Sequence, residues 1–114
     1  MDIKLYKLKV KKGKEKVAKE WLAFLKENTD QGSQLLKNEK AYLEAYFCAK
    51  ESGTMYVYMF FAAEDVDYSN KTAKKSKSPL DEKHFAYMKE CINLLAGDIM
   101  DCLFYMDNLE DLKT

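Results

Sequence analysis

The chain has 114 residues, of which 47% are hydrophobic and 33% charged, a composition typical of one globular domain with its own core. Its formal net charge is zero, so a broad electrostatic attraction to nucleic acid or anionic membranes is not expected. No apolar run reaches the roughly 18 residues of a membrane span, and the charged stretch MDIKLYKLKV lacks the apolar segment of a signal peptide.

The spacing of the apolar residues predicts six regular elements. They are a strand at 3–10, a helix at 14–28 resuming to about 39, strands at 41–50 and 54–63, a helix from Pro79 to a stop at Gly97, and a strand at 98–106. The glycine turn at 51–53 makes the middle strands a hairpin. Residues 64–78 are polar and unpatterned, which predicts a mobile loop, and 107–114 are expected to form a frayed acidic tail.

The second helix has a capping-box pattern at its start. Ser78 suits the N-cap, Pro79 the first helical position and Asp81 the third. The order strand, helix, strand, strand, helix, strand is that of the ferredoxin-like α+β fold, also called split βαβ. We therefore expect residues 1–114 to form one domain, in which two helices cover one face of a four-stranded antiparallel sheet and leave the other bare.

We expect the plainer apolar side of each strand to face the helices. The residues expected there are Leu43, Ala45, Phe47, Val57, Met59, Phe61, Met100, Cys102 and Phe104. The residues expected on the bare face are Lys7, Lys9, Tyr42, Glu44, Tyr46, Tyr56, Tyr58, Phe60, Asp101, Leu103 and Tyr105. An aromatic patch of this extent exceeds what a monomer normally exposes to water, so something must cover it.

Three coverings of the bare face are physically reasonable: a second copy of the chain, a nucleic acid strand or a small ligand. A second copy is the simplest, because two such sheets bury both patches about a two-fold axis. Charged groups in that interface need partners. Lys7 and Asp101 are expected to pair, while Glu44 needs a tyrosine hydroxyl, a lysine of the second copy or water.

Three stretches carry a resemblance to known proteins: YKLKVKKGKEKVAKEWLAFLKEN, YLEAYFCAKESGTMYVYMFF and DEKHFAYMKECI, at 6–28, 42–61 and 81–92. They resemble the dimeric α+β barrel superfamily, which includes small antibiotic-biosynthesis-monooxygenase-like proteins. More narrowly, the chain resembles a family of short bacterial proteins of unknown function. The resemblance implies a ferredoxin-like homodimer, sometimes with an interior pocket for a small organic molecule. No haem, flavin or metal signature occurs, so no cofactor is expected.

The candidate catalytic residues are His84, the only histidine, and Glu44, which lies among tyrosines. His84 is expected in the first turn of its helix, where the dipole disfavours protonation, and a neutral imidazole can act as a base or position a ligand. Glu44 would have a raised pKa inside a pocket. The alternatives are a packed histidine with one hydrogen bond, and a carboxylate that protects an edge strand or pairs across the dimer.

Further candidate ligand-binding residues come from the same aromatic face. They are Tyr42, Tyr46, Tyr56, Tyr58 and Asp101. Their hydroxyl and carboxyl groups can orient a polar ligand; the alternatives are interface packing for the tyrosines and an ion pair with Lys7 for Asp101. The lysines within 71–77 form either a lid over a pocket or a solvated linker.

Three functions stay open at this point. The first is a small-molecule-binding or regulatory homodimer, and the second is a cofactor-independent monooxygenase, isomerase or lyase with His84 or Glu44 as its base. The third is an RNA-binding sheet, but SGTMYVYMFF lacks the basic residue and the second small position of an RNA-recognition motif. The odd cysteine count, with neither metal nor redox spacing, indicates buried thiols in a reducing cytoplasm. We favour the binding module.

Overall fold

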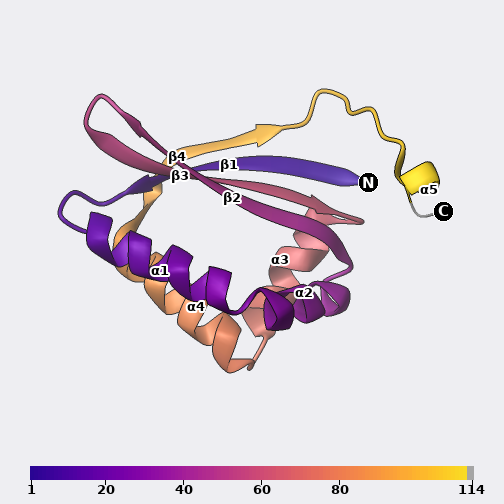
Figure 1. Cartoon of the computed structure of the whole chain (residues 1–114), viewed down its shortest axis with the longest axis horizontal. Helices are drawn as coiled ribbons and strands as arrows, with labels where there is room; N and C mark the ends of the chain where they lie inside the picture. Colours follow the sequence, from indigo (N-terminus) through magenta and orange to yellow (C-terminus); the bar gives the residue numbers. More distant parts are fainter. Residues whose placement is uncertain (113–114) are drawn as a thin grey trace.

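The computed structural model describes residues 1–112, and it contains one antiparallel sheet with helices on one side (Figure 1). Its elements are β1 (Asp2–Val10), α1 (Glu15–Glu27), α2 (Thr29–Asn38), β2 (Ala41–Glu51), β3 (Thr54–Ala63), α3 (Val66–Lys75), α4 (Pro79–Cys91), β4 (Ile92–Asp101) and α5 (Leu109–Leu112). The sheet order is β2-β3-β1-β4, with every neighbouring pair antiparallel. The ferredoxin-like fold predicted from the sequence is therefore confirmed. Residues 113 and 114, at the end of the predicted tail, lie outside the described residues.

The long predicted first helix is two helices in succession. The side-chain amide of Asn28 donates to the carbonyl oxygen of Phe24 at 2.8 Å, and α1 ends there. The chain resumes at once as α2 and runs to Asn38, as the sequence predicts. This break lets α2 turn toward the edge strand β2, against which it packs.

The loop predicted at 64–78 is wrong, because most of it forms α3. The carboxylate of Asp65 accepts a hydrogen bond from the Tyr68 amide at 3.1 Å and so caps the helix. Ser69 is fully buried and donates to the carbonyl oxygen of Glu39 at 2.6 Å. Val66 is the only large apolar side chain that α3 buries, so the segment has too weak an apolar stripe to be recognised from its spacing.

The boundary between the last helix and the last strand was also predicted wrongly. The helix α4 begins at Pro79 as expected but ends at Cys91, and β4 starts at Ile92. Gly97 is a strand residue paired with Leu8, with a φ of 108°. Because Val10 already pairs with Ile92, the residues between Ile92 and Gly97 form a bulge.

Strand pairing shows which side chains share a face of the sheet, because directly opposed residues point the same way. The faces predicted for β3 are confirmed, since Val57 and Phe61 are buried beneath the helices. The face predicted for β2 is wrong. Glu44 and Tyr46 pair with Phe61 and Met59 and therefore face the helices.

This error arises because both sides of β2 carry apolar residues, so the sequence does not show which side faces outward. Leu43 and Phe47 lie on the open face, where 51% and 59% of their surface is exposed. In β4, Asp101 pairs with Lys4 and shares the face of Phe61, whereas Met100 pairs with Leu5 on the open face. Leu103 and Tyr105 follow the end of the strand.

Of the three cysteines, Cys91 alone is buried, so the burial predicted for the others is wrong.

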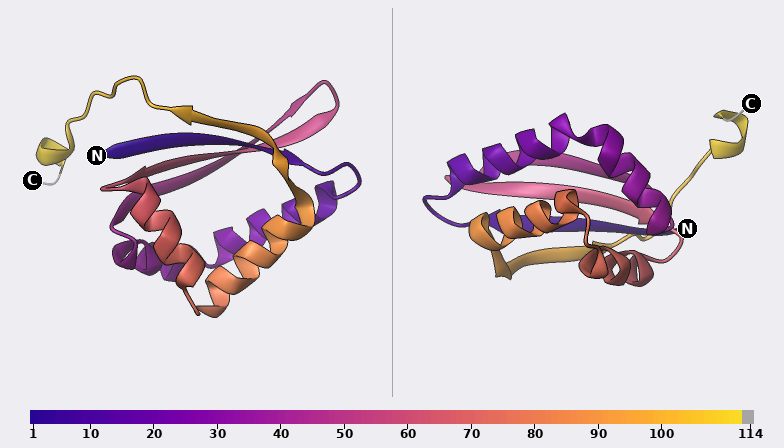
Figure 2. Two further views of the ribbon diagram at one scale, coloured as in Figure 1. Left: turned by 180° about the vertical axis from the view of Figure 1, so that it is seen from behind. Right: turned by 90° about the horizontal axis from the view of Figure 1, so that it is seen from below.

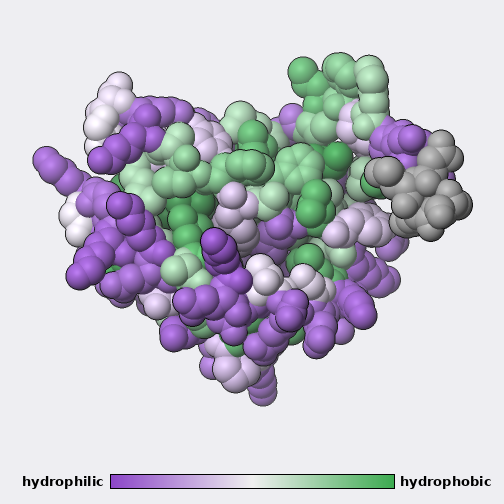
Figure 3. All heavy atoms as spheres, viewed as in Figure 1, coloured by the Kyte–Doolittle hydropathy of each residue, from purple (hydrophilic) through white to green (hydrophobic). Residues whose placement is uncertain are grey.

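The helices α1 to α4 all lie on one side of the sheet, as two opposite views show (Figures 1 and 2). The main core between them is formed by Val10, Ala18, Trp21, Met55, Val57, Cys91 and Ile92. Seen from the front, apolar residues gather over the sheet and the segment after β4, whereas the outer helix surface is polar (Figure 3). Among the described residues, no helix is long and apolar enough to cross a membrane.

Candidate functional site

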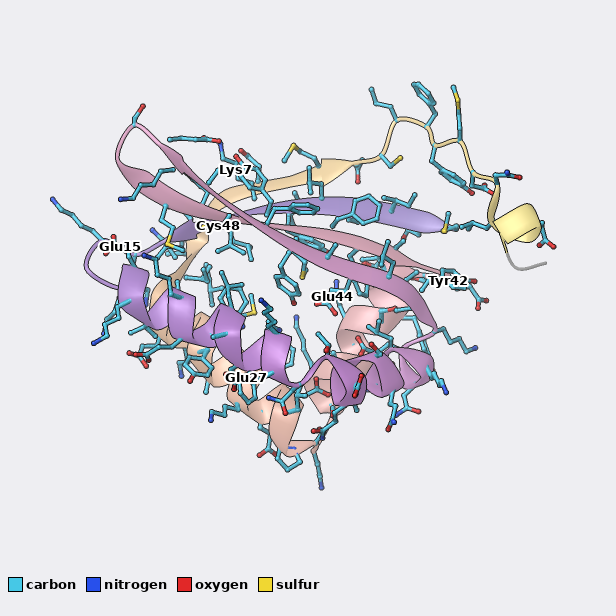
Figure 4. The ribbon with its side chains drawn as sticks, viewed as in Figure 1. Lys7, Glu15, Glu27, Tyr42, Glu44 and Cys48 are labelled. Carbon is cyan, nitrogen blue, oxygen red and sulfur yellow. The ribbon has the colours of Figure 1, made fainter. Side chains whose placement is uncertain are left out.

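A cavity of about 440 Å³ opens between α1, α2, the edge strand β2 and the start of α4. We call it the acidic pocket, because three of its lining residues are Glu39, Glu44 and Asp81. Its volume is within the range of small-molecule sites. Figure 4 shows Glu44 beneath β2 on the side of the helices, with Lys7 on the opposite side of the sheet. The hydrocarbon part of the lining comes from leucines of α1, α2 and α4.

His84 lines this pocket from the second turn of α4, one turn later than predicted. The indole Nε1 of Trp21 donates to its Nδ1 at 2.9 Å. Because an indole N–H can only donate, Nδ1 holds a lone pair and the neutral ring carries its proton on Nε2. Burial lowers the pKa of His84 to about 4, although the charge of Asp81 opposes this. The imidazole is therefore a neutral hydrogen-bond donor near pH 7, and its one basic nitrogen is occupied.

Glu44 and Tyr46 lie two residues apart on β2 and so point to the same side. The hydroxyl of Tyr46 donates to the carboxylate of Glu44, and its ring packs edge-on against Trp21 with centroids 5.9 Å apart. Burial raises the pKa of Glu44, the hydrogen bond from Tyr46 lowers it, and the charge of Asp81 raises it further. Burial also raises the pKa of Tyr46. Glu44 thus lines a pocket on the helix side of the sheet, and its role in catalysis or binding stays a prediction.

Two acidic residues of the pocket were not predicted. Glu39 caps the C-terminus of α2, where burial and the charges of Glu44 and Asp81 raise its pKa to about 7. Asp81 was assigned to a capping box, but Ser78 makes no side-chain cap bond, and Asp81 lines the pocket instead. These side chains meet only in the folded protein, where α2 packs against β2 and α4 packs against α1, so sequence spacing gave no signal for either.

Four of the predicted site residues lie elsewhere. Tyr42 is 61% exposed near the start of β2, and Tyr56 and Tyr58 are on the open face. The predicted ion pair between Lys7 and Asp101 is wrong. The amine of Lys7 contacts Glu51 at 2.9 Å and lies 4.4 Å from the ring centre of Tyr56, whereas Asp101 pairs with Lys4, its neighbour across β1 and β4.

In the part of the chain that the structure describes, no group of three or more His, Cys, Asp or Glu residues is placed to hold a metal ion. The acidic side chains therefore surround the pocket without converging on one point. Such an arrangement can contact several atoms of a larger ligand.

Fold and site together define a small ferredoxin-like α+β protein with an acidic cavity under its edge strand. The chain belongs to DUF6176, a family of unknown function, whose sequence model matches residues 1–107. None of the curated proteins matches it.

Several solved structures share the fold at low sequence identity. Protein Atu4242 from Agrobacterium tumefaciens is 17% identical with a TM-score of 0.56, over 89% of this chain and 92% of its own. A protein proposed to be an antibiotic biosynthesis monooxygenase, from Nitrosomonas europaea, is 12% identical with a TM-score of 0.53, over 91% and 100%. L-rhamnose mutarotase FA22100 from Formosa agariphila is 16% identical with a TM-score of 0.51, over 94% and 100%. These likenesses agree with the predicted superfamily resemblance at the level of the fold.

Proposed function

We propose that the protein is a homodimer that binds a small organic molecule in the acidic pocket. The observation that carries this proposal is that three carboxyl groups and a neutral histidine line one largely apolar cavity of about 440 Å³. Buried polar groups are costly unless they find partners, and such groups at a concave apolar surface are the usual features of a ligand site.

The open face of the sheet supports the homodimer. Leu43, Phe47 and Met100 are each more than a third exposed there, beside the half-buried rings of Tyr58 and Phe60. The helix α3, which was predicted as a loop, lies with the other helices on the opposite side of the sheet (Figure 2). A second copy presents an identical apolar face, and an interface of this kind is closed by a two-fold axis.

Trp21 provides a direct measurement of ligand binding. It is the only tryptophan, and it contacts His84 and Tyr46, which both line the pocket. We expect pocket ligands found by a thermal-shift screen of cationic, anionic and neutral compounds to change its fluorescence. Titration of that signal then gives each dissociation constant.

A variant that fills the pocket tests the location of the ligand. Gly32 lines the cavity from α2, and a Cβ placed there meets no atom within 4 Å. We expect Gly32→Phe to weaken binding of the screened ligands by about tenfold or more and Gly32→Ala to leave it nearly unchanged. Equal binding to both variants, or a screen in which no class of compound stabilises the protein, would contradict the proposal.

A second candidate function, a cofactor-independent enzyme, is favoured by one observation. The pKa of Glu39 is about 7, and acid–base catalysis is most efficient when the pKa of the catalytic group is near the working pH. Ligands from the screen should then be chemically changed on incubation, as followed by NMR. At saturating ligand, Glu39→Gln should abolish that change, and ligands that the wild type returns unaltered would leave binding as the sole function.

A further inference from the structure

The charges around the acidic pocket are unbalanced. The carboxyl groups of Glu39, Glu44 and Asp81 line it, whereas Lys26 is the only lysine that does so, and the chain has no arginine. Among the described residues, neither Lys26 nor any other lysine forms an ion pair within 4.0 Å with these three groups. The pocket therefore has an excess of negative charge whenever its carboxyl groups are ionised.

Asp81 is the most informative of the three, because it is buried without a partner. Only 8% of its surface is exposed, and in the described part of the chain its carboxylate makes no side-chain hydrogen bond and does not cap α4. It borders both the acidic pocket and an adjoining cavity of about 330 Å³, which Glu39 also lines. Its carboxylate oxygens are not sealed from these cavities, so their charged partner can come from outside the chain.

The remainder of the lining indicates what else that partner contains. Leucine side chains from three helices provide a hydrocarbon surface, namely Leu22, Leu25, Leu35, Leu36 and Leu80. The carboxyl groups are not placed to hold a metal ion together. An organic molecule with both a positive charge and a hydrocarbon portion therefore matches the lining better than a metal ion does.

We propose that the ligand of the acidic pocket is an organic amine, whose ammonium group contacts Asp81 and Glu39 while its hydrocarbon portion packs on the leucines. This proposal rests on the proposed function, whose site it uses. His84 offers its Nε2–H and Glu44 its carboxylate to any further polar group of the same ligand. The adjoining cavity shares Leu35, Glu39 and Asp81 with the acidic pocket.

The ionisation of the pocket supports a positively charged ligand. The charges of Glu44 and Asp81 both raise the pKa of Glu39, which shows that the three carboxyl groups repel one another. An ammonium group favours the ionised form of each carboxyl group. Binding of an amine near pH 7 should therefore release protons, which calorimetry in two buffers of different ionisation enthalpy detects. The other titratable or charged groups that line the pocket are His84, Tyr46, Cys48 and Lys26.

Three compounds with similar skeletons test the proposal on the full-length protein: phenethylamine, 2-phenylethanol and 3-phenylpropionate. We expect phenethylamine to change Trp21 fluorescence at a concentration about tenfold or more below that needed for the alcohol. The carboxylate should bind more weakly than either. Equal binding of the amine and the alcohol, or tighter binding of the carboxylate, would overturn the proposal.

A pair of neighbouring variants identifies the charge responsible. Asp81→Asn keeps the shape of the buried side chain, and Glu82→Gln removes one charge from the next residue of α4, which is exposed. Asp81→Asn should weaken phenethylamine binding by about tenfold without lowering the melting temperature, whereas Glu82→Gln should leave binding unchanged. If Asp81→Asn does not fold, Glu39→Gln makes the same test.

Equal effects of the paired variants would overturn the amine proposal. Its failure is distinguishable from that of the proposed function. Uncharged or anionic ligands that lose affinity in Gly32→Phe would refute the amine and leave the pocket as the ligand site.

Discussion

The only tryptophan and the only histidine of the chain determine each other's role. Trp21 donates to Nδ1 of His84 from 63 positions away in the sequence, so no local pattern reveals the contact. Sequence reasoning identified His84 and Glu44 as candidates because isolated titratable residues among aromatics are typical of sites. The proton on Nε2 makes His84 a donor, so the carboxyl groups of the pocket, and not the histidine, are the groups that can accept a proton.

Glu39 should make the protein less stable as the pH rises. Its pKa is about 7 in the folded protein and near 4.5 in the unfolded chain. The stabilisation from this raised pKa is complete below the unfolded value and is lost as the pH rises through about 7. Because Glu39 is half-buried, solvent screening reduces the effect to about 1–2 kcal/mol. His84 acts in the opposite sense, since its pKa is lowered and its stabilisation is lost as the pH falls.

Glu39→Gln removes the effect of Glu39 on the pH dependence of stability and keeps that of His84. Urea unfolding of both proteins should show the variant gaining about 1–2 kcal/mol on the wild type between about pH 5 and about pH 8. The surface variant Glu20→Gln is the control. Curves for Glu39→Gln and the wild type that run parallel across this range would contradict the raised pKa.

At the scale of elements, sequence patterns predicted the hairpin closely and the helix-to-strand transition poorly. The strand at 54–63 matches β3, because the turn at Ser52 and Gly53 is fixed by two residues with positive φ. Gly97 was interpreted as a helix stop, since a glycine after an apolar helical pattern usually is one. Gly97 lies inside β4 instead, where it adopts a positive φ. Only the pairing of β4 with β1 shows this position.

Gly97→Ala should therefore be strongly destabilising. A Cβ at Gly97 would lie 2.2 Å from the carbonyl oxygen of Lys7, and the φ of +108° is strained for any L side chain. We expect a loss of about 2–4 kcal/mol in the free energy of unfolding. The control is Gly32→Ala, where a Cβ meets open space in a helix and should stabilise slightly. Similar unfolding midpoints for the two variants would show that the bulge at Gly97 is absent.

At the scale of the whole molecule, the order of elements was sufficient to predict the fold. The ferredoxin-like arrangement depends on which strands and helices follow one another, and errors at their boundaries did not change it. The side chains facing the pocket depended on the register of β2. Both of its faces are apolar, so alternation alone did not distinguish Glu44 and Tyr46 inside from Leu43 and Phe47 outside.

The two faces of the sheet thus have separate roles in the proposed function. The helices and the acidic pocket lie on one face, and the proposal places a second copy on the other. Leu43→Lys places a charge on the open face, at a half-exposed position outside the pocket lining. Gln34→Lys places the same charge on the exposed surface of α2 and should leave the assembly unchanged.

Light scattering on the protein as it elutes from a size-exclusion column measures the mass of the assembly. This mass tests whether a second copy covers the open face. The wild type and Gln34→Lys should have twice the 13.3 kDa mass of one chain, and Leu43→Lys should elute as a folded single chain. A wild-type protein of single-chain mass at all concentrations, or a dimer that Leu43→Lys leaves intact, would contradict a second copy packed on this face.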